Sequence, residues 1–583
     1  MSMLARLAIE TKTVPRRARG RLRVVGVLFA IGFISLGIRL VDMAGGGLQG
    51  HVRAEAAVTG PEPAIRAEIR DRRGQVLAGN VEIPSVFADP RVIADPETTA
   101  SLLAAALRDV DASELLKIFE HKRRFAWVKR QITPGEQQAL LELGIPGVSF
   151  RYGEHRIYPT RHLASHVLGF VDLDNKGIAG VEFALQDRLE NTIDGATGKP
   201  LGPLDLSLDA RVQHAVRDEL HQAVSEFQAQ GGCGLVRDIK TGELVALVSL
   251  PDFDPNKPQL ATANSRKNRC AAEVYELGSL FKVITAGMAL DSGAVTLWDR
   301  FDATEPLKIG KYRVRDYHAK KRALTVPEII AHSSNIGVAK MAFAAGGRER
   351  QQAFLKALGL TERPVVELGE RGAPLMPQRW PDITTATVAY GHGIAVSPLQ
   401  FLEAASTLVG DGTRVPTTLL KRDADWQFEG TPVVSPSTVR DVRWLMWLTA
   451  AKGTGAKGNS QTYLVGGKTG TADKTRIGRR GYSDRAVLAS YLGVFPIDEP
   501  RYAVMIILDE PKGNERTFGY RTGGWTAAPT VGRIIDRIGP VLGVAPSTPM
   551  AATRLEDLLE IRPAWDGYHG KTEEGFAAVR PAG

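Results

Sequence analysis

Cysteine is almost absent from this chain. Among 583 residues only Cys233 and Cys270 occur, and neither stands at the spacing of a metal-ligand set. This excludes a cysteine metal centre, and the sequence predicts no metal and no cofactor. The spacing does not decide whether the two cysteines form a disulfide or remain thiols, one in a strand and one in a loop, and we expect thiols.

Long apolar runs are scarce, and only one stretch reaches membrane-spanning length. Residues 24–38 carry no charge, and the stretch counted from 22 to 41 would form about 30 Å of helix, enough to cross a bilayer. We predict a transmembrane anchor at residues 24–43 of a single-pass protein. The alternative is a cleaved signal peptide ending near Ala44, but the apolar run is long for one.

A surplus of charge is lacking beyond the first 23 residues. The net charge is +9, but residues 1–23 hold seven Lys and Arg side chains against the single Glu10. The rest of the chain mixes both signs, which argues against a nucleic-acid-binding face. Basic residues ahead of an apolar span stay in the cytoplasm, so we expect a cytoplasmic tail at 1–23 and the rest of the chain outside.

Length and composition indicate several folded domains. At 43% hydrophobic and 24% charged residues the chain is globular, and its length suggests two or three domains. We place one domain at 44–222, beginning with a Gly/Pro-rich linker at 44–63, a second at 223–545, and a flexible tail at 546–583. Helical periodicity is clearest at Pro96–Arg108, Thr133–Leu143 and Ala210–Phe227.

Strand-like runs in the second domain bracket a mainly helical middle. We predict an α+β fold in which a five-stranded antiparallel sheet carries an inserted helical lobe, and a closing helix at Pro529–Leu542 packs on that sheet. The strands are expected at Cys233–Asp238, Glu243–Leu250, Tyr463–Asp473, Ala486–Pro496 and Tyr502–Leu508.

Three short motifs follow one another in this domain. They are Ser279-Leu-Phe-Lys282, Ser333-Ser-Asn335 and Lys468-Thr-Gly-Thr471. Each motif alone is weak, because patterns this short occur by chance in most long proteins. Their order, at a helix start, a helix break and a strand, predicts a serine acyl-transfer site.

The first motif supplies a nucleophile and a base. Ser279 opens the helical run 280–290, where free backbone N–H groups and the helix dipole stabilise an oxyanion. Lys282 shares its helix face and lies within reach of the serine oxygen, and a buried lysine near other cations can act as general base. Taken alone, the pair would be a helix cap and a surface lysine.

The second motif interrupts a helical region that begins with the capping box Thr325-Val-Pro-Glu328. At this break Ser333 could relay a proton to a leaving amine, and Asn335 could hold a substrate amide through its donor and acceptor. An ordinary helix cap explains the same residues.

The third motif lies on a predicted strand. Lys468 and the hydroxyls of Thr469 and Thr471 would bind a carboxylate, while the backbone N–H groups of Thr471 and Ser279 would form an oxyanion hole. A substrate backbone could add to this strand because it is bare at Gly466, Gly467 and Gly470.

Four tempting features are set aside. Gly467-Lys-Thr469 lacks the glycine of a phosphate-binding loop, since Thr462 stands in its place. Asp172-Leu-Asp-Asn-Lys176-Gly resembles a calcium loop, but its lysine occupies a ligand position. His332 and His392 lie beside the motifs, yet a lysine-based site needs no histidine, so we expect structural roles for both.

With the three motifs in place, the chain resembles the class B penicillin-binding proteins over nearly its whole length. Nearest is the division-specific (septal) peptidoglycan D,D-transpeptidase of the FtsI type. Ala67 stands where glycine is usual in one shared segment, and Leu277 stands where proline is common ahead of Ser279. The shared segments of the first domain are Arg66–Ala78, Arg156–Pro159 and Gly177–Glu182.

The resemblance implies a fold, a reaction and partners. It implies a pedestal (penicillin-binding protein dimerisation-type) domain at 44–222 and a transpeptidase domain of the serine β-lactamase-like fold at 223–545. Ser279 would attack the penultimate D-alanine carbonyl of a stem pentapeptide with Lys282 as base, and an amine of a second stem peptide would complete the cross-link. β-Lactams would acylate Ser279. The family also implies an inner-membrane location at the division site and a glycan polymerase of the SEDS type as partner.

Other functions are weighed against this one. Elongation-specific relatives usually carry Asp at the position of Asn335, which favours the division enzyme. A catalytically idle division scaffold is disfavoured by the intact motifs. A β-lactam sensor would need a larger cytoplasmic part than residues 1–23, and a bifunctional class A enzyme would need glycosyltransferase motifs, which we do not find in 44–222.

Overall fold

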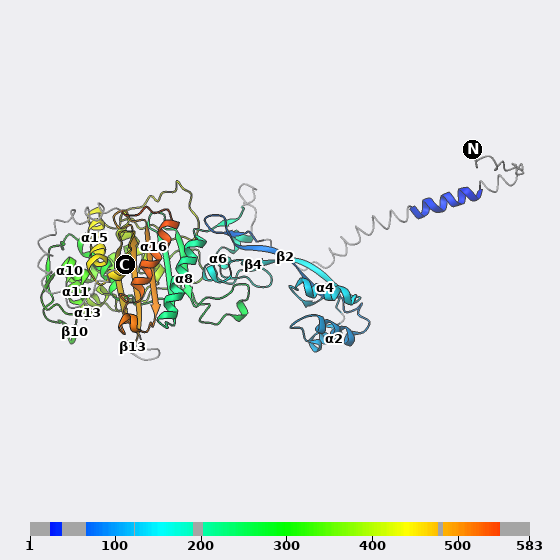
Figure 1. Cartoon of the computed structure of the whole chain (residues 1–583), viewed down its shortest axis with the longest axis horizontal. Coiled ribbons are helices and arrows are strands. Elements are labelled where there is room, and N and C mark those ends of the chain that lie inside the picture. Colours follow the sequence, from blue (N-terminus) through cyan, green and yellow to red (C-terminus); the bar gives the residue numbers. More distant parts are fainter. Residues whose placement is uncertain (1–23, 38–65, 122, 191–201, 476–481, 548–583) are drawn as a thin grey trace, which may run out of the picture. The chain divides into compact units, whose positions relative to one another are not determined.

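The structure is a computed structural model that describes residues 24–37, 66–121, 123–190, 202–475 and 482–547 (Figure 1). Its contacts form two compact units. The first contains Glu82–Gly153, and the second contains Ala64–Val81 and the chain from Glu154 onward.

The predicted membrane anchor lies partly outside the described residues. Residues 24–37 form a helix whose apolar side chains are exposed. Within the part of the chain that the structure describes, no helix is both long enough and apolar enough to cross a membrane. The predicted tail at 1–23 and nearly all of the tail at 546–583 also lie outside it.

The first unit packs three capped helices against strands. Side chains of Asp95 and Asp111 and a capping box at Thr133 begin the three helices, and Leu103 and Phe119 are buried in their shared core. Helices predicted at 96–108 and 133–143 are confirmed to within two residues. The elements are α2 (Pro96–Ala106), α3 (Ala112–Glu120), α4 (Pro134–Leu143), β3 (Ala126–Lys129), β4 (Val148–Ile157) and the end of β2 (Val76–Ala88), with which β3 and β4 pair.

A buried ion network joins three segments of the second unit. Arg66 Nε donates to Glu182 Oε2 at 3.0 Å, and Arg156 Nε donates to Glu182 Oε1 at 2.7 Å, with each residue exposed 1% or less. Removing one partner would leave a buried charge uncompensated, so the network holds the segments together. The elements around it are β1 (Ile69–Arg70), β5 (Leu204–Asp205), η1 (Arg161–Ala164), α5 (Ser165–Leu168), α6 (Gly180–Ala184) and α7 (Gln186–Glu190).

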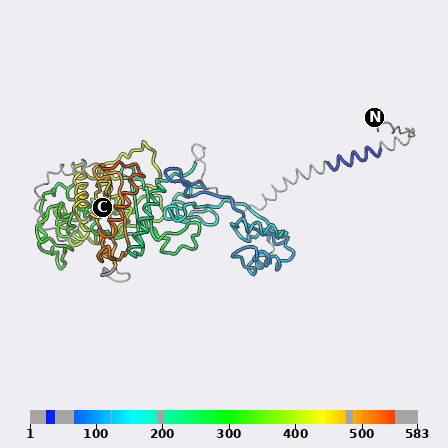
Figure 2. Tube along the Cα trace, in the orientation of Figure 1, coloured from blue at the N-terminus to red at the C-terminus, as the bar shows by residue number. Residues whose placement is uncertain are grey.

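A five-stranded antiparallel sheet in the order β12-β13-β14-β6-β7 forms the centre of the second unit. Figure 2 shows how strands from early and late in the domain, coloured green and orange, lie together. All five predicted strands are confirmed. They are β6 (Gly231–Asp238), β7 (Leu244–Leu250), β12 (Gly466–Thr475), β13 (Tyr482–Phe495) and β14 (Tyr502–Asp509).

Helices cover both faces of this sheet. On β14, Val504 and Ile506 belong to the core that contains α8 (Ala210–Glu226) and α16 (Ala527–Val541), whereas Met505 and Ile507 belong to the core of the helical lobe. This alternation is the period of a strand buried on both sides. The helices predicted at 210–227 and 529–542 are confirmed.

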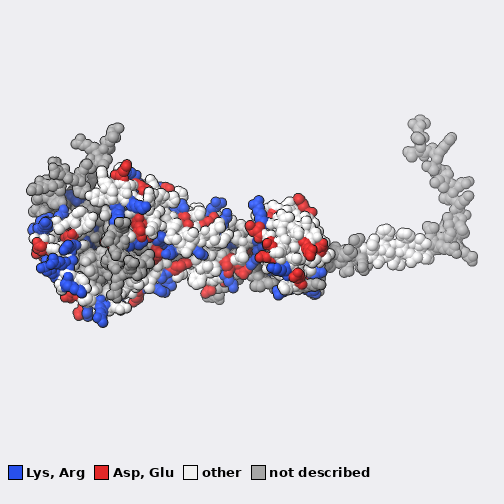
Figure 3. Space-filling model, turned by 90° about the horizontal axis from the view of Figure 1, so that it is seen from below, with Lys and Arg blue, Asp and Glu red and all other residues white. Residues whose placement is uncertain are grey.

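The helical lobe holds two small antiparallel ladders, β8 (Arg300–Asp302) with β11 (Ala323–Thr325) and β9 (Leu307–Ile309) with β10 (Tyr312–Val314). On the face drawn in Figure 3 both signs of charge mix, but basic side chains gather at the left end, the end where β10 lies in Figure 1. The helices of the lobe are α9 (Phe281–Asp291), α10 (Val326–Ala331), α11 (Asn335–Ala344), α12 (Gly347–Ala357), α13 (Asp382–Ala389), α14 (Pro398–Val409) and α15 (Pro436–Lys452).

Candidate active site

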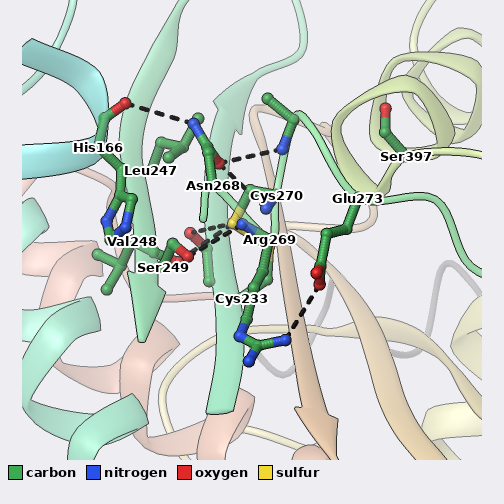
Figure 4. Close-up of a disulfide and its surroundings, with 12 residues drawn as sticks. His166, Cys233, Leu247, Val248, Ser249, Asn268, Arg269, Cys270, Glu273 and Ser397 are labelled. Carbon is green, nitrogen blue, oxygen red and sulfur yellow. Dashed lines mark hydrogen bonds and ion pairs between the residues drawn. A yellow bond between two sulfur atoms is a disulfide. The ribbon is translucent and has the colours of Figure 1, made fainter. Parts of the chain in front are cut away.

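A disulfide fixes the segment that leads to the candidate nucleophile. Cys233 on β6 and Cys270, nine residues before Ser279, are bonded to each other and buried (Figure 4). The expectation of two free thiols is wrong. After β7 the chain turns back and lies against it, since the Arg269 N–H donates to Ser249 Oγ at 3.0 Å. Sequence spacing carries no sign of this return.

Ser279 lies in a one-turn 3₁₀ helix, η3 (Gly278–Leu280), that leads directly into α9. Its side chain is partly exposed, although both of its neighbours are buried. Gly278 has φ +53°, a left-handed conformation that suits glycine. The expectation that Ser279 opens this helix is confirmed, and Ser279 is a partly exposed residue at the start of a buried helix.

The three motifs meet at the hydroxyl of Ser333. Lys282 Nζ donates to Ser333 Oγ at 3.0 Å and also to the Ser333 carbonyl oxygen, and Lys468 Nζ donates to the same Oγ at 3.2 Å. Among the described residues the hydrogen bonds of Lys282 go to Ser333 and not to Ser279. The structure therefore brings the two lysines together at Ser333.

Burial depresses the proton affinity of both lysines. Lys282 and Lys468 are fully buried. Burial and then the like charge of Lys468 hold the pKa of Lys282 well below its usual value, although the carboxylate of Asp316 opposes this shift. Burial lowers the pKa of Lys468 to about 7. An amine with so low a pKa is partly in its neutral form near pH 7, and in that form it can accept a proton.

Asp316 is a functional candidate that the sequence reasoning missed. Its Oδ2 accepts a hydrogen bond from Ser334 Oγ at 2.7 Å, and its Oδ1 accepts from the backbone N–H of Ile336 at 2.9 Å. Ser334 in turn caps α11 by accepting from Gly337 N–H. The carboxylate thus holds the turn that carries Ser333. The only sign in the sequence is that this is the one acid between residues 306 and 327.

The amide of Asn335 is partly occupied. Its Nδ2 donates to the carbonyl oxygen of Arg315 at 2.9 Å, and within the described part of the chain its amide oxygen remains open to a substrate N–H. The capping box predicted at Thr325 and Glu328 is confirmed.

The threonines of the third motif are tied to neighbouring loops. Thr469 Oγ1 lies 2.9 Å from Thr454 Oγ1, and Thr471 Oγ1 accepts from Gly523 N–H at 3.1 Å. Their strand, β12, is the outermost strand of the sheet among the described residues. Its outer edge can therefore take up an added strand, as expected.

The glycines of β12 are required for a different physical reason from the one predicted. A Cβ on Gly467 would lie 1.9 Å from the hydroxyl of Tyr491, and one on Gly470 would lie 2.2 Å from Ser490 Oγ. These positions are bare because the protein itself fills the space, not because a substrate approaches there. The strand is open to a ligand because it is an edge.

The turn that carries Ser279 lies against β12. A Cβ on Gly278 would lie 2.8 Å from the carbonyl oxygen of Thr471, and Gly278 N–H donates to the Gly391 carbonyl oxygen at 3.2 Å. The two backbone N–H groups predicted for the oxyanion hole, those of Ser279 and Thr471, therefore belong to neighbouring segments.

The features set aside in the sequence have other surroundings. Burial lowers the pKa of His332 to about 4 and also lowers that of His392, so both rings are neutral near pH 7. Asp172 Oδ1 accepts from the backbone N–H groups of Asp174 and Lys176, as in a tight turn. In the described part of the chain no group of His, Cys, Asp and Glu could hold a metal ion.

Comparisons with known proteins cover both halves of the chain. Residues 232–536 match the model of the penicillin binding protein transpeptidase domain, and residues 61–191 match that of the penicillin-binding protein dimerisation domain. The chain is 42% identical to a probable peptidoglycan D,D-transpeptidase FtsI of Caulobacter vibrioides (strain NA1000 / CB15N), over 83% of this chain and 82% of that protein.

Two further similarities are more distant. A probable peptidoglycan D,D-transpeptidase PenA of Neisseria meningitidis (strain DSM 15465 / Z2491) is 34% identical over 93% of this chain and 96% of its own. The crystal structure of penicillin binding protein 3 from Mycobacterium tuberculosis, complexed with aztreonam, has a TM-score of 0.65 at 23% identity and covers 84% of this chain and 98% of its own. At that identity it shows a shared fold.

Proposed function

This chain belongs to the class B penicillin-binding proteins, and from that membership we propose that it is a septal peptidoglycan D,D-transpeptidase that cross-links stem peptides through an acyl-serine intermediate during cell division. The observation that carries the proposal is the meeting of Lys282 and Lys468 at Ser333 Oγ, beside the turn of Ser279. A serine, two amines of lowered pKa and a hydroxyl between them can together carry out an acyl transfer without a metal or a cofactor.

Acylation uses the neutral amine of Lys282. It takes the proton of Ser279 as the serine oxygen attacks the penultimate D-alanine carbonyl, and the backbone N–H groups of Ser279 and Thr471 stabilise the oxyanion. The C–N bond then breaks, and the proton passes through the hydroxyl of Ser333 to the leaving D-alanine amine. Lys468 in its charged form, with Thr469, Gly470 and Thr471 of the same strand, holds the terminal carboxylate.

Transfer to the second stem peptide reverses these steps. An acceptor amine attacks the ester carbonyl and gives up its proton, and Ser279 regains one as the amide cross-link forms. Asn335 holds the donor peptide through its free amide oxygen. A penicillin enters the same site and forms the same kind of ester with Ser279. Its leaving group stays attached because it is part of the opened ring, so this group continues to block the place where an acceptor amine would bind.

The setting of the enzyme is part of the proposal. The basic residues of 1–23 and the apolar run from 24 to 38 support a single anchor in the inner membrane, with the catalytic part outside and at the division site. A pedestal at 44–222 and a transpeptidase domain at 223–545 are consistent with the matched ranges. A glycan polymerase of the SEDS type would be its partner there.

Intact-mass spectrometry of the full chain with a penicillin tests the function. We expect one stable adduct on the wild-type protein, none on Ser279→Ala, and an unchanged adduct on Ser292→Ala, which alters a serine at the other end of α9. Rapid loss of the adduct would indicate a hydrolase or carboxypeptidase. No adduct on the wild type would contradict the serine mechanism and favour a scaffold.

A further inference from the structure

A basic surface lies beside the second motif. Residues 308–322, which we call the basic segment, include β10 and carry seven Lys and Arg side chains, all exposed, with Asp316 as the only acid. Arg322 forms an ion pair with Glu328 at 2.7 Å. In Figure 3 basic side chains gather at this end of the molecule. The other six are Lys308, Lys311, Arg313, Arg315, Lys320 and Lys321.

The charges of this segment oppose the stability of its own ladder. Lys308 on β9 and Arg313 on β10 are direct cross-strand partners. Like charges at directly opposite positions destabilise an antiparallel pair. A merely solvated surface gains nothing from this arrangement, whereas an anionic ligand would stabilise it.

Two contacts fix the basic segment to the candidate active site. The carbonyl oxygen of Arg315 accepts from Asn335 Nδ2 at 2.9 Å, and Asp316 accepts from Ser334 Oγ at 2.7 Å. The exposed cations before and after these residues are thereby held beside the turn of Ser333. A ligand bound to the basic segment would therefore lie on a surface that is joined to the candidate active site through Arg315 and Asp316.

We propose that the basic segment binds the free carboxylates of stem peptides along the glycan strand whose donor peptide occupies the site, an inference that rests on the proposed function. An uncross-linked strand presents a row of stem peptides that end in carboxylates, so it is a polyanion. The carboxylate of the reacting peptide meets Lys468, and those of neighbouring peptides meet the basic segment. Several weak charge contacts then add up through the shared strand.

The first test changes the ligand and leaves the protein intact. Full-length wild-type protein is titrated with soluble, uncross-linked glycan strands whose carboxylates are either free or amidated. We expect the amidated strands to bind at least about tenfold more weakly, and binding of the free strands to weaken as salt screens the charges. Equal affinity for the two strands would overturn the proposal.

The second test changes the protein. A triple variant, Lys308→Glu, Lys311→Glu and Arg313→Glu, keeps like charges opposite each other in the ladder but reverses their sign. We expect its Kd for free strands to rise at least about tenfold. The matched control reverses three exposed cations outside the segment, Lys356→Glu, Arg363→Glu and Lys421→Glu, and its Kd should stay within about twofold. Equal losses in both variants would contradict docking at the basic segment.

Competing ligands give the remaining outcomes. The wild-type protein is also tested with phosphatidylglycerol vesicles and with a single-stranded oligonucleotide. If either of these binds the basic segment and free glycan strands do not, the proposal is wrong and the segment is a membrane-binding or nucleic-acid-binding surface. Penicillin adduct formation by the wild-type protein reports on Ser279 separately. Loss of that adduct with intact strand binding would contradict the proposed function and not the docking surface.

Discussion

At the scale of single residues, Ser333 connects the two lysines of the site. Its φ of +60° is left-handed, which costs an L-residue roughly 1–2 kcal/mol. The conformation is held by Lys282, which donates to both its carbonyl and its hydroxyl, and by Asp316, which fixes the next residue. This backbone conformation places the Ser333 hydroxyl where both Lys282 and Lys468 can donate to it, and these hydrogen bonds offset the cost of the conformation.

The rate of acylation should depend on pH through both lysines. Lys282 must be neutral to act as base, so the second-order rate constant with a penicillin should fall as acid protonates it. Lys468 must be charged to hold a carboxylate, so the rate constant should also fall above about pH 7, the value to which burial lowers its pKa. In Lys468→Met the like charge is gone and the pKa of Lys282 rises. The fall of the rate constant on the acid side of the pH–rate profile (the acid limb) should then move to higher pH. A shift of this acid limb to lower pH would contradict the role given to the two lysines.

Neutralising Asp316 should shift the same limb in the opposite direction. Its charge raises the pKa of Lys282, so Asp316→Asn lowers that pKa and moves the acid limb to lower pH. Loss of one hydrogen bond to a charged group, about 1.5–3 kcal/mol, should also slow acylation about tenfold or more. Asp302→Asn, an exposed acid on β8, is the control. A slower rate with an unmoved acid limb would give Asp316 a structural role alone.

The motif residues could be found from the sequence, but Asp316 could not. Ser279, Lys282, Ser333 and Lys468 stand in recognisable local patterns. Asp316 lies 17 residues before Ser333, and only the fold of the intervening loop and β11 brings its carboxylate to the start of α11. A contact of this kind leaves no periodic or local pattern.

At the scale of elements, a turn rich in glycine supports the turn that carries Ser279. A Cβ on Gly391 would lie 2.2 Å from the carbonyl oxygen of Gly278, one residue before Ser279. Gly391 and Gly393 share nearly the same left-handed φ, +82° and +80°, but a Cβ on Gly393 would meet nothing nearer than 3.6 Å. The turn therefore provides its own matched pair of variants.

Gly391→Ala should impair acylation much more than Gly393→Ala. Both changes strain the backbone by roughly 1–2 kcal/mol. Only the first also pushes on the turn of Ser279, so we expect its acylation rate to fall at least about tenfold and that of Gly393→Ala to stay within about threefold. Stopped-flow acylation and thermal unfolding of both variants measure this. Equal rates would mean that the turn does not position the nucleophile.

The elements themselves were predictable because their patterns are local. Several of the strands are short continuous apolar runs that are bounded by turn residues, and the closing helix carries a helical apolar stripe. The role of the glycines on β12 was misjudged, since a sequence shows a missing side chain but not the Tyr491 or Ser490 that fills its place.

At the scale of the whole molecule, the Cys233–Cys270 disulfide ties the central sheet to the segment before Ser279. The bond spans 37 residues, and closing a loop of that length should stabilise the folded state by about 4 kcal/mol through the entropy of the unfolded chain. Sequence alone left this bond undecided because its two ends meet only after the chain has folded back over β7.

The double variant Cys233→Ala with Cys270→Ala should have a free energy of unfolding about 4 kcal/mol lower than that of the wild type. Denaturant unfolding of the full chain, followed by fluorescence, measures the difference. Wild-type protein that is unfolded in the presence of a reductant should have the same free energy of unfolding as the variant, because both then lack the cross-link. A loss below about 1 kcal/mol would show that the unfolded chain is not restrained by the bond.

The same bond makes residues 233–270 a covalent ring, which includes the exposed stretch around Leu260. A protease that nicks the ring once leaves both fragments joined through sulfur, with Ser279 still fastened to β6. A nicked enzyme thus remains a single molecule and keeps the means to refold, and it separates into two pieces only when denatured and reduced together.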